Sequence, residues 1–87
     1  MPLVWVPALL HELTGGQETV TVPGATVREV VVELERRFPG IEARICDQHG
    51  LRPGMAVVVD AEVARLGLLQ PVSEKSEVHF LPAIGGG

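Results

Sequence analysis

The stretch with the clearest chemical potential is the end of the chain, where a strand-like segment runs into glycine. Residues 78–87 read Val-His-Phe-Leu-Pro-Ala-Ile-Gly-Gly-Gly. Gly85, Gly86 and Gly87 have no side chains, so they offer only backbone and the carboxylate of Gly87. Glycine loses more entropy than any other residue when it is ordered, which makes this a poor ending for a purely structural strand. We expect a narrow, mobile tail that presents a carboxylate to another protein's active site. A plain disordered terminus is the alternative.

The other residues that often carry chemistry do not form a recognisable site. His11, His49 and His79 are scattered, and none has a second ligand at helical i, i+4 spacing. Cys46 has no flanking catalytic motif, and a lone cysteine is often a small buried hydrophobe. No helix start follows the Gly15-Gly16 run, as a phosphate-binding loop requires. We therefore predict no catalytic residue, no metal site and no bound cofactor, that is, a protein that is not itself an enzyme.

Composition and net charge further limit the class of protein that this chain can be. The chain has 87 residues, enough for one domain, and 46% of them are hydrophobic, enough for one modest core. The net charge is −4 and aromatic residues make up 3%, whereas nucleic-acid binding favours a basic surface with stacking aromatics. A single cysteine excludes an internal disulfide, and neither a membrane span nor a signal peptide is apparent. These features predict a cytoplasmic protein that binds neither nucleic acid nor membrane.

The elements that position the tail begin with a β-hairpin. Residues 3–10 favour extended backbone, with Pro7 confining that part to an edge or an end. Residues 11–16 end in Gly-Gly and predict a turn. Residues 17–22 alternate polar and apolar side chains, which is typical of a half-buried strand.

A helix follows the hairpin. Thr26 and Glu29 have the spacing of a capping box, and Pro39-Gly40 predicts the end of the helix. One apolar stripe runs along it through Val27, Val30, Val31, Leu34 and Phe38.

The second half supplies two more strands. Residues 41–45 resemble a short helical turn, and residues 55–59 are apolar on both faces and therefore predict a central strand. Residues 61–69 are ambiguous, with Val63, Leu66 and Leu69 expected to face inward. Residues 77–81 form the last strand. Hairpin, helix, strand and return strand pack most economically as an α+β β-grasp, a mixed sheet with one main helix across it. We assign the domain to residues 1–82 and the tail to residues 83–87.

The chain resembles the MoaD/ThiS sulfur-carrier family, small ubiquitin-like β-grasp proteins with a di-glycine end. The similarity runs over nearly the whole chain and is carried by four motifs: Thr14-Gly15-Gly16-Gln17, Gly24-x-Thr26-Val27, Phe38-Pro39-Gly40-Ile41 and the ending from Phe80 to Gly87. The first and last of these look most like the carrier that feeds sulfide to cysteine synthesis. The small subunit of molybdopterin synthase is the close alternative. Gly85 departs from the pattern, since this ending more often has alanine there.

The resemblance implies a mechanism. An ubiquitin-activating-like adenylyltransferase uses ATP to adenylate Gly87, and a sulfur donor displaces AMP to leave a thiocarboxylate. Gly85, Gly86 and Gly87 then thread into an acceptor, either a PLP-dependent cysteine synthase-like enzyme or the large subunit of molybdopterin synthase. Thiamine synthesis and tRNA thiolation are further destinations.

The partner's docking surface is expected near the base of the tail. Apolar character alone selects these residues, and core packing is the alternative role for most of them: Phe80, Leu81, Pro82, Met55 and Val57. A different class of function, an ubiquitin-like protein modifier joined to target lysines through Gly87, uses the same tail. Lys75 is the only lysine, which disfavours a modifier that forms homopolymeric chains.

Overall fold

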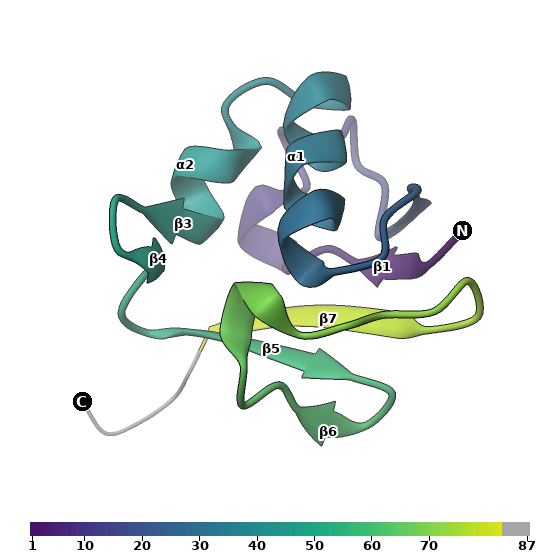
Figure 1. The fold of residues 1–87 in the computed structure, drawn as a ribbon. Coiled ribbons are helices and arrows are strands. Elements are labelled where there is room, and N and C mark those ends of the chain that lie inside the picture. Colours follow the sequence, from purple (N-terminus) through teal and green to yellow (C-terminus); the bar gives the residue numbers. More distant parts are fainter. Residues whose placement is uncertain (83–87) are drawn as a thin grey trace.

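The computed structural model describes residues 1–82 and has a five-stranded mixed sheet at its centre (Figure 1). The strands are β1 (Leu3–Trp5), β2 (Thr19–Thr21), β5 (Met55–Val59), β6 (Glu62–Val63) and β7 (Glu77–Pro82). They lie in the order β2-β1-β7-β5-β6. Strand β7, the last in sequence, occupies the middle, parallel to β1 and antiparallel to β5. The predicted α+β β-grasp is confirmed, and β5 is flanked on both sides as expected.

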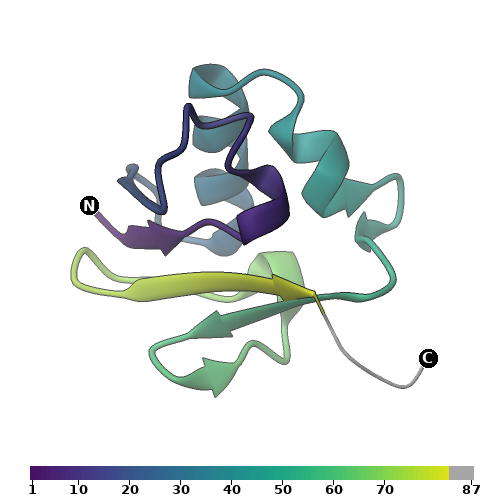
Figure 2. The ribbon, with the colours of Figure 1, turned by 180° about the vertical axis from the view of Figure 1, so that it is seen from behind.

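The main helix, α1 (Val27–Arg37), begins where the capping box predicts. The Thr26 hydroxyl accepts a hydrogen bond from the Glu29 N–H at 3.2 Å. The Glu29 carboxylate reaches back one residue further than the motif requires and accepts from the Ala25 N–H at 2.9 Å. One of the helix's first free N–H groups is thereby satisfied, and the residue before the cap is tied to the first turn, which stabilises the start of the helix. Figures 1 and 2 show α1 crossing one face of the sheet.

The core lies between α1 and that inner face of the sheet. The apolar stripe of α1 is buried, apart from Phe38, which follows the helix and packs against the core partly buried. Alternate residues of the strands meet it: Val4 of β1, Val57 and Val59 of β5, Val78 and Phe80 of β7. Because side chains alternate along a strand, the residues between these point away from α1, toward the opposite face.

Gly24 fixes the entry to α1 by its small size. A Cβ built on Gly24 would lie 3.0 Å from both the backbone nitrogen and a side-chain methyl of Val30. The backbone φ of 156° also favours glycine. The Gly24-x-Thr26-Val27 motif therefore combines a close approach, a cap and the first buried helix residue.

A second, short helix, α2 (Ile41–Ile45), is held by a carboxylate from α1. The Glu35 side chain accepts hydrogen bonds from the Gly40 N–H at 3.0 Å and the Glu42 N–H at 2.8 Å. These backbone hydrogen bonds, the one from Gly40 first, lower the pKa of Glu35. Gly40 adopts φ 100°, a left-handed conformation that lets the chain turn from α1 into α2.

The Glu35→Gln variant should therefore lose stability at neutral pH and little at strongly acidic pH. A carboxyl whose pKa is lower in the folded state stabilises the fold above its unfolded pKa, about 4.3 for glutamate, and this stabilisation is lost as the pH falls through the lowered value. Urea midpoints of both proteins at pH 7 and at pH values below 4 measure the gap. Glu33→Gln on the same helix is the control, because Glu33 only pairs with Arg36 at the surface. A gap for Glu35→Gln that does not change with pH would contradict the assignment.

The first strand is shorter than predicted. It ends at Trp5, and Ala8–Leu10 form a 3-10 helix, η1, in place of the strand expected up to residue 10. Pro7 has no N–H to donate to a ladder, and its carbonyl instead accepts from the Leu10 N–H at 2.9 Å. A small hairpin of β3 (Cys46–Asp47) and β4 (Gly50–Leu51) follows α2 and was not predicted.

Residues 61–69 also differ from the expectation. Val63, Leu66 and Leu69 were expected to face inward, but they are 68%, 59% and 72% exposed. The Val63–Val58 pairing places Val63 on the sheet face away from α1, and Gly67–Leu69 form a second 3-10 helix, η2. Leu68 packs against the core in their place.

Candidate functional site

The base of the tail is the part of the predicted site that the structure describes. Gly85, Gly86 and Gly87 lie outside the described residues. Their anchor is β7, whose last residue, Pro82, pairs with Met55 at the start of β5. Strand β7 pairs with β1 through residues 77–79 and with β5 through residues 78–82, so its end is held by β5 at one corner of the sheet.

The sheet face opposite α1 carries an aromatic cluster beside this strand. The rings of Trp5 and His79 are stacked, with centroids 5.2 Å apart and planes 6° from parallel. Trp5 Nε1 donates to the Glu77 carboxylate at 3.2 Å, and His79 Nε2 lies 3.9 Å from the same oxygen. Leu81 follows along β7 and is 43% exposed. We call Trp5, His79 and Leu81 the outer-face cluster.

For two of the predicted docking residues, the predicted role is wrong. Phe80 and Val57 are paired neighbours on β7 and β5, each 1% exposed, and both belong to the core. Strand alternation sends them inward, toward α1, so they do not form an exposed docking surface, although Phe80 contributes to the lining of the groove described next. Leu81 and Pro82 are exposed and Met55 is half-buried, so these three remain accessible.

A groove of about 470 Å³ opens where β7 ends. Its lining combines β1 and β7 with the start of β5, η1 and α2, and includes Trp5, Leu9, Arg44, Met55 and Pro82. Most of this lining is apolar, and Leu9 is 76% exposed. We call it the tail-base groove. Of the predicted docking residues, Met55, Leu81 and Pro82 reach it with their surfaces exposed or half-buried.

The remaining candidates have local structural roles. The His11 ring nitrogen hydrogen-bonds the Val6 carbonyl at 2.9 Å. Cys46 is buried, and burial followed by the nearby Glu42 charge raises the pKa of its thiol, which keeps it protonated. Within residues 1–82 no three His, Cys, Asp or Glu side chains come close enough to hold a metal ion. Nor does this described part contain a helix long and apolar enough to cross a membrane.

Sequence reasoning missed Trp5, Leu9 and Arg44 as surface features near the tail. The sequence predicts one strand that contains both Trp5 and Leu9, and it does not indicate on which face of the sheet Trp5 lies. The break that Pro7 makes in that strand was a usable signal for Leu9, because it releases the following residues from the sheet. No local signal brings Arg44 to this corner.

Comparison with known proteins gives a consistent result. The family model described as the ThiS family matches residues 4–87. The sulfur carrier protein CysO of Mycobacterium tuberculosis is 33% identical, over 97% of this chain and 96% of its own. A chain of the Amycolatopsis orientalis BexX/CysO complex has a TM-score of 0.92 at 35% identity, with both chains fully covered. SAMP1 of Haloferax volcanii, a small archaeal modifier protein, has a TM-score of 0.79 at 26% identity, covering 99% of this chain and 98% of its own.

Proposed function

This chain belongs to the ThiS family and is a sulfur carrier protein, and from that premise we propose that Gly87 carries the sulfur as a thiocarboxylate destined for cysteine synthesis. The observation that carries the proposal is the similarity to CysO over almost the full length of both chains. The fold supports it, because β7, the middle strand of a packed sheet, anchors the base of the tail.

The proposed chemistry needs two partners before the acceptor. A carboxylate is a poor acyl donor because its oxygen is a poor leaving group. An ubiquitin-activating-like adenylyltransferase would join the Gly87 carboxylate to AMP and release pyrophosphate from ATP. Sulfur from a donor then attacks the carbonyl carbon, and AMP leaves. The protein itself contributes the carboxylate and a narrow backbone, since Gly85, Gly86 and Gly87 add no side chains to a channel.

The acceptor in this proposal is a PLP-dependent enzyme that builds cysteine from an activated serine. The thiocarboxylate sulfur forms a bond to the serine-derived carbon, from which the activating group leaves. Water then cleaves the bond between that sulfur and the Gly87 carbonyl carbon, so that cysteine is released and Gly87 returns to a carboxylate. That a CysO chain occurs in a complex with a second protein, BexX, supports docking to a partner in trans. The alternative destination is molybdopterin synthase, whose large subunit should copurify with this chain if that pathway is correct.

The test is the intact mass of the purified chain after incubation with an activating enzyme, ATP and sulfide. We expect an oxygen-for-sulfur increase that disappears when ATP is omitted. The charged protein is then mixed with a PLP-dependent cysteine synthase and an activated serine, and new cysteine is quantified. Charging without cysteine formation would redirect the proposal to another acceptor. A failure to charge with several competent activating enzymes would overturn it.

The similarity to SAMP1 favours a second candidate, protein modification through Gly87. In that case conjugates of higher mass should persist on a denaturing gel and vanish when Gly87 is deleted. With Lys75 as the only lysine, growth of chains of this protein is restricted to that side chain and the N-terminal amine.

A further inference from the structure

The tail-base groove combines an exposed apolar lining with a positive charge. Leu9 projects from η1 with 76% of its surface exposed, and Trp5 and Leu81 stand at the rim at 38% and 43%. Apolar surface of this kind, gathered in one concave place, is typical of a contact site. Figure 2 shows the end of β7 near η1, and the residues that line the groove come from both of these elements.

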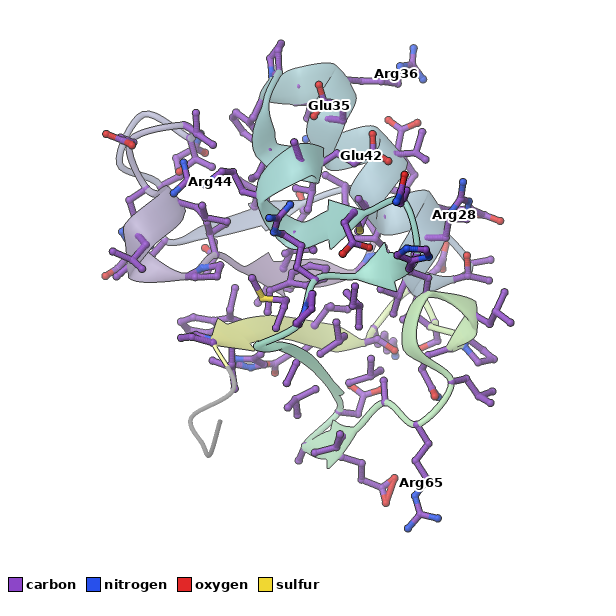
Figure 3. The ribbon with its side chains drawn as sticks, turned by 90° about the vertical axis from the view of Figure 1, so that its left-hand side faces the viewer. Arg28, Glu35, Arg36, Glu42, Arg44 and Arg65 are labelled. Atoms are coloured by element: carbon purple, nitrogen blue, oxygen red, sulfur yellow. The ribbon has the colours of Figure 1, made fainter. Side chains whose placement is uncertain are left out.

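Arg44 supplies the charge. Within residues 1–82 it is the only arginine or lysine that lines the groove, and it extends from α2 toward η1 (Figure 3). Among the described residues no carboxylate lies within ion-pair distance of its guanidinium. The chain as a whole has a net charge of −4, so this corner is a local exception to an acidic molecule. A partner that covers the groove gains by placing a carboxylate opposite Arg44.

The number of residues after Pro82 indicates which partner covers the tail-base groove. Residues 83–87 follow Pro82, and five residues reach at most about 18 Å when fully extended. An acceptor that takes Gly87 at its reaction centre must therefore bring its surface close to Pro82. Pro82 lines the groove, so the acceptor's surface around the channel mouth lies over it.

Resting on the function proposed above, we propose that the tail-base groove receives an apolar side chain of the acceptor enzyme, with a carboxylate of that enzyme paired to Arg44. Leu9 and Met55 contact the apolar side chain. Arg44 fixes the orientation of the acceptor around the tail. This contact lies beyond the tail itself and selects the acceptor by shape and charge.

The chain offers a matched control for each half of the contact. Arg65 is exposed like Arg44 but lies beyond β6 (Figure 3), so Arg65→Glu changes the net charge equally at a distant place. Leu69 is 72% exposed in η2, whereas Leu9 is 76% exposed in η1. Leu69→Ser therefore matches Leu9→Ser in chemistry, exposure and type of helix. Because all four side chains are exposed, we expect the urea midpoints of the four variants to equal that of the wild type.

The experiment measures sulfur transfer from thiocarboxylates made chemically, by intein cleavage with sulfide, so that no activating enzyme is needed. The probe is a PLP-dependent cysteine synthase with an activated serine. Arg44→Glu and Leu9→Ser should each raise the acceptor's KM for the carrier by about tenfold with kcat unchanged, as expected for a docking contact. Arg65→Glu and Leu69→Ser should stay within about twofold of wild type.

The outcomes separate the two proposals. If wild type transfers sulfur and all four variants match it, the groove contact is wrong and the carrier function stands. If Arg44→Glu and Arg65→Glu lose activity equally, net charge accounts for the effect and the groove contact is again wrong. If the wild-type thiocarboxylate transfers no sulfur to the synthase, the function proposed above fails and the groove contact fails with it.

Discussion

Deletion of Gly87 is expected to lower conversion to the thiocarboxylate by more than about 100-fold. The deletion leaves a carboxylate on Gly86, but withdraws it by about 3.3–3.6 Å, the span of one extended residue. Adenylation requires the reacting atoms to approach within about 3–3.5 Å, and misplacement by about 1 Å can already cost about 100-fold in rate. Intact mass after incubation with the activating enzyme, ATP and sulfide measures the charged fraction directly.

Gly85→Ala is the matched control for that deletion. The ending that this chain resembles more often has alanine at this position, so the methyl group should be accommodated and charging should remain close to wild type. Equal charging of the Gly87 deletion and the wild type would contradict the assignment of Gly87 as the reacting terminus. Equal loss in both variants would mean that any change in the tail is harmful and that the terminal position is not special.

Phe80→Ala should destabilise the domain by about 3–5 kcal/mol, the usual loss for removing a buried aromatic ring. Phe80 is 1% exposed in the middle strand, among the core residues that meet α1. Domains of this kind are stable by only about 5–15 kcal/mol, so the variant should be close to unfolding. Urea unfolding followed by far-UV circular dichroism measures the loss as a lower midpoint with an unchanged slope.

Leu81→Ala, one residue further along the same strand, is the control. Leu81 faces away from α1 and is 43% exposed, so its truncation should stay within about 0.5 kcal/mol. Normal stability together with impaired sulfur transfer in Phe80→Ala would restore Phe80 as a docking residue. Low stability in Phe80→Ala alone confirms its place in the core.

The parts of the fold that the sequence predicted are those with a local physical signature. The stripe through Val27, Val30, Val31 and Leu34 specifies one face of α1, and the Thr26 cap specifies its start. The apolar run of β5 indicates a strand with neighbours on both sides, which β7 and β6 supply. Each of these signals depends on residues that are close together in the sequence. The sequence alone is therefore enough to predict these elements.

The site was harder to predict because its residues are brought together by the fold. Phe80 and Leu81 are both apolar neighbours on one strand, and only the position of α1 decides which of them is buried. Arg44 reaches the base of the tail because Glu35 and Gly40 set the direction of α2, a relation between separate elements. The stack of Trp5 on His79 likewise depends on the parallel pairing of β1 with β7. Side-chain type alone does not predict which of these residues lie at the surface near the tail.

The central position of β7 also determines how the domain responds to mechanical force. A pull on the tail runs along β7, which is held by five residue pairs to β5 on one side and three to β1 on the other. Because the load is parallel to the strand, these ladders are sheared together, and none can be unzipped one bond at a time. We therefore expect the sheet to stay folded when a pull along β7 withdraws the carrier from an acceptor's channel.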